Sequence, residues 1–205
     1  MSKAATGVPV TKKVVAALQD FLGEVPSTRE TAVEDPVKRS RQLAVRASAR
    51  AAAVSGVLAM PPGPLGMLTI IPDLVAIWKI QGQMVADIAG AFGKQAYLSQ
   101  EQMLYCLFRH TATQAMKDIV VRVGERLLVR KATLRMMEAA LQKIGVRITQ
   151  RLLNKSVSRW IGPLAALVLA GYSYYDTARI AETTIEFFES DLVIGNEQDR
   201  LIYKH

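Results

Sequence analysis

The sequence predicts an all-α protein, a multi-helix bundle of about seven helices that contains an apolar helical hairpin broken by glycine and proline. Three observations support this prediction. Apolar residues recur at the helical period along most of the 205 residues, no stretch shows the alternation typical of a half-buried strand, and half of the residues are hydrophobic. That apolar content is enough for a chain of this length to bury a sizeable core.

The first expected helix covers residues 11–21. Val14, Leu18 and Phe21 fall on one face of it, and a glycine follows. Residues 24–34 are polar and lack an apolar period, so we expect a linker there.

A long apolar hairpin follows the linker. Pro36 directly after Asp35 is a standard helix start, and this helix is expected to continue to about residue 60, where a Pro-Pro-Gly-Pro run ends it. The returning helix is expected to begin near Pro72 and to end near Gly93, a residue that suits a C-terminal cap.

The second half of the chain also has the helical period. Ser99 and Gln102 have the spacing of a capping box, which predicts a helix start at residue 100. The pattern stays helical to residue 160, with breaks expected near 110–113 and 130–133, and a final helix is expected from Pro163 to about residue 190.

Three segments are expected in the chain. Residues 1–35 form an N-terminal helix and linker, residues 36–190 form the main helical domain, and residues 191–205 form a C-terminal tail. Residues 1–20 contain charges where a secretory signal needs an apolar run, and the chain has a single cysteine. These features predict a cytoplasmic protein without disulfides.

An uncharged segment spans residues 51–72. Its 22 residues match the length of a membrane span, but the central prolines exclude one straight helix. Two interpretations remain open: a hairpin buried in protein, or a hairpin that dips into lipid from one side. In the second case the residues predicted to contact the membrane are Met60, Leu65, Met67 and Leu68.

Small residues recur four apart in three of the expected helices. This spacing lets two helix backbones approach closely, in membranes and in soluble proteins. The residues predicted to mediate such packing are Gly56, Gly82, Gly90, Gly162 and Ala166.

Basic residues also recur four apart, and they belong to the most basic part of the chain. The net charge is +8, and residues 101–160 hold twelve basic and four acidic side chains. The basic ladder is Lys143, Arg147, Arg151, Lys155 and Arg159, followed by Trp160. It is either a solvated helix face or a contact for anionic lipid headgroups, where Trp160 would be an interfacial aromatic residue.

Catalytic and metal-binding patterns are absent from the sequence. It has no nucleophile elbow, paired histidines or phosphate loop, so we expect no enzyme activity, cofactor or metal. Cys106 lies in an apolar run and is expected to be buried and inert. His110 is expected near a helix end or on the surface, and Asp73 in the first turn of its helix. No nucleic-acid-binding motif accompanies the basic residues.

Several motifs resemble the EcsC family of bacterial proteins. Residues 56–66 form a glycine- and proline-rich apolar turn, which precedes Ile71-Pro72-Asp73-Leu74 and a helix that closes at Phe92-Gly93, where the family often has Tyr-Gly. The resemblance covers residues 36–190. It implies an all-helical protein with a membrane-proximal role, no agreed biochemical activity and no catalytic residues.

The sequence therefore predicts a non-enzymatic helical protein at the cytoplasmic face of a membrane. The apolar hairpin and the basic helix face would contact an anionic membrane surface or a membrane protein. The alternative is a soluble adaptor or homo-oligomer that binds a protein partner, in which the small-residue ladders close a core or a subunit interface.

Overall fold

The computed structural model describes residues 3–58, 70–116, 119–123, 126–129, 132–155 and 163–190. These hold six α-helices of nine residues or more: α1 (Lys3–Leu22), α2 (Pro36–Leu58), α4 (Ile70–Ala91), α5 (Gln100–Phe108), α7 (Leu134–Lys155) and α8 (Pro163–Glu189). The shorter elements are the 3-10 helix η1 (Gln95–Tyr97), the helix α6 (Thr113–Met116), and the strands β1 (Val120–Val123) and β2 (Arg126–Val129). The predicted helical bundle is confirmed.

Two predicted helix starts are formed by the expected side chains. The carboxylate of Asp35 accepts a hydrogen bond from the backbone N–H of Lys38 at 2.9 Å. At the start of α5, the Ser99 hydroxyl accepts from the Gln102 N–H at 3.3 Å, and the Gln102 side chain accepts from the Ser99 N–H at 3.0 Å. Both starts satisfy backbone donors that a helix leaves without partners.

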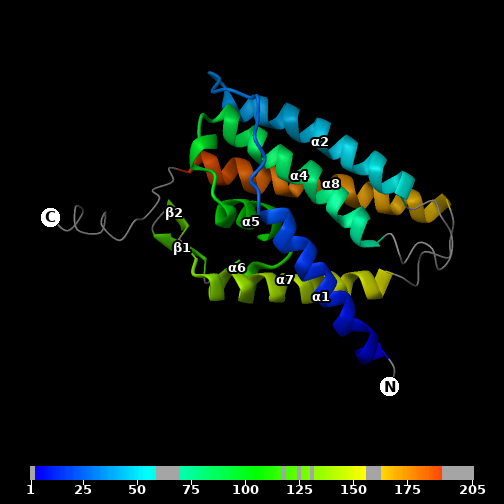
Figure 1. The fold of residues 1–205 in the computed structure, drawn as a ribbon. Coiled ribbons are helices and arrows are strands. Elements are labelled where there is room, and N and C mark those ends of the chain that lie inside the picture. The colour runs from blue at the N-terminus through cyan, green and yellow to red at the C-terminus, as the bar shows by residue number, and fades with distance from the viewer. Residues whose placement is uncertain are drawn as a thin grey trace.

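The helices α2, α4 and α8 form one layer of the fold (Figure 1). The chain returns from α2 into α4, and the two helices pack against each other, as the predicted hairpin requires. The helix α8 lies against both of them, and it packs most extensively on α2. The turn of the hairpin, residues 59–69, lies outside the described residues.

The helices α1, α5 and α7 lie on one side of this layer (Figure 1). The side chains of Val14 and Leu18 on α1 are fully buried, and α1 packs on both α7 and α4. The rings of Phe21, Trp78 and Phe108 lie 6.1 Å apart in succession, which connects α1, α4 and α5. The N-terminal helix therefore shares one core with the rest of the described chain.

The linker between α1 and α2 follows the surface of α4. The hydroxyl of Thr28 donates a hydrogen bond of 2.5 Å to the carboxylate of Asp87, and the N–H of Val33 donates to the carbonyl of Ala91 at 3.1 Å. Glu30 forms an ion pair of 2.6 Å with Arg39 at the start of α2. The linker is thus held by specific contacts along its length.

A helix expected between the breaks near 110–113 and 130–133 is replaced by a β-hairpin. The strands β1 and β2 are antiparallel, with Val120 opposite Val129 and Val123 opposite Arg126. The spacing of the arginines in this segment matches a helix, but its valines are β-branched and favour strands. The prediction of a continuous helix there was wrong.

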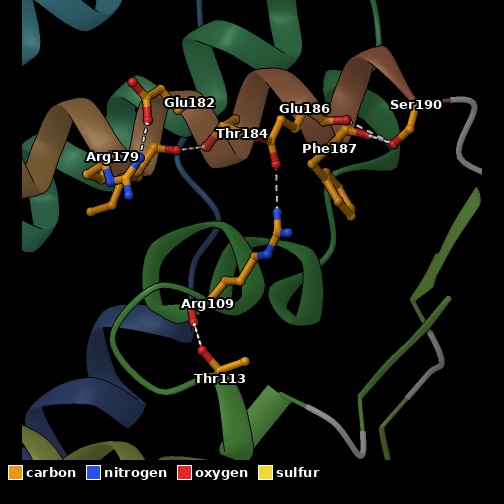
Figure 2. Close-up of polar contacts among 9 residues, drawn as sticks. Arg109, Thr113, Arg179, Glu182, Thr184, Glu186, Phe187 and Ser190 are labelled. Atoms are coloured by element: carbon orange, nitrogen blue, oxygen red, sulfur yellow. Dashed lines mark hydrogen bonds and ion pairs between the residues drawn. The ribbon is translucent and has the colours of Figure 1, made fainter. Parts of the chain in front are cut away.

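Polar contacts attach the end of α5 to the last turns of α8 (Figure 2). Nη1 of Arg109 lies 2.9 Å from a carboxylate oxygen of Glu186, and the Arg109 carbonyl accepts a 2.8 Å hydrogen bond from the hydroxyl of Thr113. Beneath them Phe187 is fully buried, with its ring 5.3 Å from that of Tyr105. This packing fixes the C-terminal half of α8 against α5.

Candidate functional site

The basic face predicted on residues 143–159 begins on the outer side of α7. Lys143 and Arg147 are both exposed. They line an open depression of about 500 Å³ together with the following residues: Ala112, Gln114, Gln142, Val146 and Gln150. Apart from the two cations, the lining carries neutral polar and small apolar side chains. The depression is therefore suited to an anionic group.

The opposite face of α7 explains why these cations point outward. Leu141 and Ile144 are buried in the core, and Gly145 allows α7 to lie close to α1. These apolar residues thus form the core face of the helix. Residues 143 and 147 lie off that face, so the amphipathic pattern directs them to solvent.

The remaining predicted membrane contacts are only partly described. Arg151 and Lys155 lie in the last turns of α7, where the backbone is described and their side chains are not. The other predicted contacts lie outside the described residues: Met60, Leu65, Met67, Leu68, Arg159 and Trp160. Gly162, predicted to pack helices, also lies outside them.

Gly56 lies where two helices pack closely. A Cβ at this position would lie 3.6 Å from the Cβ of Ala170 on α8. Next to it, the Ser55 hydroxyl donates a 3.3 Å hydrogen bond to the carbonyl of Leu169. Ala166, one turn earlier on α8, is half-buried. These small residues therefore pack α2 against α8 within the chain.

The glycines of α4 contact other parts of the chain. Gly82 faces the ring of Phe21 on α1, and a Cβ at this glycine would lie 2.9 Å from the nearest ring carbon. At Gly90 a Cβ would lie 2.7 Å from the carbonyl oxygen of Glu30 and 2.8 Å from a methyl carbon of Thr28. Gly90 therefore accommodates the linker backbone and does not pack a second helix, because the linker crosses α4 at this point.

A polar cluster that sequence reasoning missed joins α4, α8 and the end of α5. Nε2 of His110 donates a hydrogen bond to the carboxylate of Asp176 at 2.9 Å. The Gln81 amide donates to the same carboxylate and to the Thr177 hydroxyl, each at 3.1 Å. His110 lies just after a helix, as expected, but its ring is turned to Asp176. Only the tertiary fold brings these residues together, since they lie 66 and 95 residues from Asp176.

Cys106 is buried on α5, as predicted. Its exposed fraction is zero, and burial raises the pKa of the thiol to about 12, an effect that a hydrogen bond with Thr184 partly opposes. A thiol that is both inaccessible and protonated is a poor nucleophile. Within the described ranges, no three His, Cys, Asp or Glu side chains are grouped to hold a metal ion.

None of the helices in the described part of the chain combines the length and hydrophobicity needed to cross a bilayer. Comparisons of the chain with protein-family models, curated proteins and solved structures found no match.

Proposed function

We propose that this chain is a non-enzymatic, EcsC-like helical protein that binds the cytoplasmic face of a membrane through the outer face of α7. The observation that carries the proposal is the pair of exposed cations, Lys143 and Arg147, lining an open depression. Arg151 and Lys155 continue the same spacing to the end of the helix. From Leu134 to Lys155 the helix holds five basic residues and one acidic residue.

The charge of α7 suits an anionic lipid surface. Each basic residue near such a surface contributes about 1 kcal/mol to binding, and salt screens the attraction. Replacing three of these residues with glutamate is therefore expected to weaken binding by two orders of magnitude or more. The uncharged residues 59–69 would add an apolar contact.

The packing of the small-residue ladders argues against a homo-oligomer built on these residues. Gly56, Gly82 and Gly90 each have close neighbours within the chain. These three glycines thus contact other parts of the same chain.

The test is flotation of the detergent-free chain with liposomes of phosphatidylcholine, with and without phosphatidylglycerol, at low and high salt. We expect binding that requires the anionic lipid and falls with salt. The triple variant Arg147→Glu, Arg151→Glu and Lys155→Glu is expected to remain in the unbound fraction.

A matched control changes the same net charge elsewhere: Arg29→Glu, Lys38→Glu and Arg41→Glu, three exposed basic residues in the linker and at the start of α2. This control is expected to float nearly as well as the unchanged chain. Equal loss in both triple variants would mean that only net charge matters, and absence of flotation by the unchanged chain would overturn the proposal.

A further inference from the structure

One end of the α2, α4 and α8 layer is almost free of charge. Its residues are 51–58 of α2, 70–78 of α4 and 163–175 of α8, and we call this part the uncharged end. Asp73 is its single charged residue, and that residue is 9% exposed. The other parts of the same three helices carry many charges, so the charge is segregated along the layer.

The segments of the uncharged end meet in space. The Ser173 hydroxyl donates a 3.3 Å hydrogen bond to the carbonyl of Ala51, and Ser55 does the same to Leu169. These two bonds align the end of α2 with the start of α8, in antiparallel directions. Figure 1 shows the start of α4 and the C-terminal end of α7 toward the same side of the molecule.

Large apolar side chains are exposed on the uncharged end. Leu167 is 71% exposed and Val168 69% on α8, and Val57 is 63% exposed on α2. Tyr174 and Tyr175 follow on α8 with 42% and 60% exposure. A contiguous exposed group of aliphatic and aromatic side chains indicates a surface that meets a less polar medium than water.

Beyond the uncharged end, the outward faces of α8 and α2 carry charged residues. On α8, Arg179 and Glu182 are the exposed residues that follow Tyr175, and the guanidinium of Arg179 lies 5.8 Å from the Tyr175 ring centre. On α2, Arg46 and Arg50 are exposed before the uncharged end begins. The hydrogen bond between Ser173 and Ala51 places the change from apolar to charged residues on α8 beside the same change on α2.

The dimensions fit one leaflet of a bilayer. Residues 163–175 extend for about 20 Å along the helix axis. The hydrocarbon core of a bilayer is about 30 Å thick, so one leaflet provides about 15 Å. Tyrosine is enriched at the headgroup level, and arginine binds anionic headgroups.

We propose that the uncharged end inserts into one leaflet of an anionic membrane, with Leu167, Val168 and Val57 among the acyl chains. Tyr174 and Tyr175 then lie at the headgroup level, and Arg46 and Arg50 contact the phosphates. This inference rests on the proposed membrane binding and names its insertion surface. A lipid occupant is favoured over a second copy of the chain, because exposed tyrosines and then arginines follow the apolar side chains in the order of a membrane interface.

The first experiment measures the environment of position 167. Leu167→Cys is labelled with the polarity-sensitive fluorophore NBD, which reacts at that site because Cys106 is buried. We expect a blue shift and stronger emission when phosphatidylglycerol vesicles are added. The control is Val33→Cys, in the linker before α2, where a 41% exposed valine lies outside both the uncharged end and α7. Its emission is expected to stay unchanged.

The second experiment measures flotation of Leu167→Gln with Val168→Asn at high salt, where the charge contribution is screened. Loss of these apolar contacts is expected to lower binding about tenfold or more. The control combines Val33→Gln with Val45→Asn, since these valines are 41% and 59% exposed and lie outside both the uncharged end and α7. This control is expected to float like the unchanged chain.

The outcomes separate the two proposals. Flotation of the unchanged chain without an NBD shift at position 167 would overturn the insertion surface and leave the α7 contact in place. Absence of any flotation would overturn both. A dimer in vesicle-free buffer that the Leu167 and Val168 changes dissociate would identify a second copy as the occupant and would also overturn insertion.

Discussion

A Cβ atom on Gly145 of α7 would lie 2.5 Å from Cγ2 of Val15 on α1. This distance is far shorter than a normal carbon contact, so the two helices touch where one of them has no side chain. Val15 is β-branched and 5% exposed, and its methyl group has little freedom to move. Gly145→Ala is therefore expected to push α1 from α7 and to cost about 1–3 kcal/mol of unfolding free energy. Urea unfolding measures this loss.

Gly171→Ala is the matched control for that substitution. Gly171 lies inside α8, is exposed, and has no atom within 4 Å of its Cβ position. Alanine is a better helix former than glycine, so this variant is expected to gain about 0.5–1 kcal/mol. A loss at Gly171, or a gain at Gly145, would contradict the described contacts.

The carboxylate of Asp176 accepts hydrogen bonds from both His110 and Gln81, and its side chain is 21% exposed. Asp176→Ala leaves those two donors without their acceptor, which is expected to cost about 1–3 kcal/mol. The measurement is the urea midpoint at unchanged m-value. Glu182→Ala is the control, because Glu182 pairs with Arg179 on the surface, where ion pairs contribute little. An equal loss of unfolding free energy in Asp176→Ala and Glu182→Ala would mean that the polar cluster contributes no more stability than a surface ion pair.

The thiol of Cys106 is expected to be unreactive in the folded chain. At pH 8 a group with a pKa of about 12 is almost entirely protonated, and burial denies access to the reagent. A disulfide reagent such as DTNB should therefore react only at the rate of unfolding, and at once in urea. Fast reaction of the native chain would show that α5 opens locally.

The ion pair between Glu30 and Arg39 predicts a dependence of stability on pH. The hydrogen bond from Arg39 holds the pKa of Glu30 below its ordinary value of 4.5, although partial burial opposes this. A lowered pKa in the folded state stabilises the fold above pH 4.5, and this contribution is lost as the pH falls through the folded value. Glu30→Gln is expected to reduce stability modestly at pH 7 and to have no effect at low pH.

The control for this experiment is Glu24→Gln, an exposed carboxylate in the same linker. Thermal unfolding between pH 3 and pH 7 is compared for both variants. A difference between Glu30→Gln and the unchanged chain that does not decrease as the pH falls would show that the glutamine disturbs packing and that charge is not the cause.

Local signals in the sequence predicted helix starts where a capping residue or a proline marks them, whereas α1 begins at Lys3, eight residues before the expected start. The capping box of Ser99 and Gln102 and the pair Asp35-Pro36 are both formed as expected, because these residues act within one turn of the chain. The opening of α8 at Pro163 follows the same principle. The outward orientation of Lys143 and Arg147 could be predicted because helical periodicity separates core and solvent faces.

Features that depend on tertiary contacts could not be predicted in this way. The role of Gly90 depends on where the linker crosses α4, and the acceptor for His110 lies on a helix far along the chain. The β-hairpin was missed because arginines at helical spacing competed with a strand signal from only a few valines. The exposure of Leu167 depends on which sides of α8 the helices α2 and α4 cover.

The packing of α2 against α8 has a consequence during protein synthesis. Ala51 and Ser173 are 122 residues apart, so the ribosome adds the residues between them in on the order of ten seconds. Throughout that time α2 has emerged while the helix that covers its small-residue face has not. The nascent chain therefore exposes an apolar helical hairpin before the layer closes, and this stage is the one at which a chaperone or a nearby membrane would first encounter it.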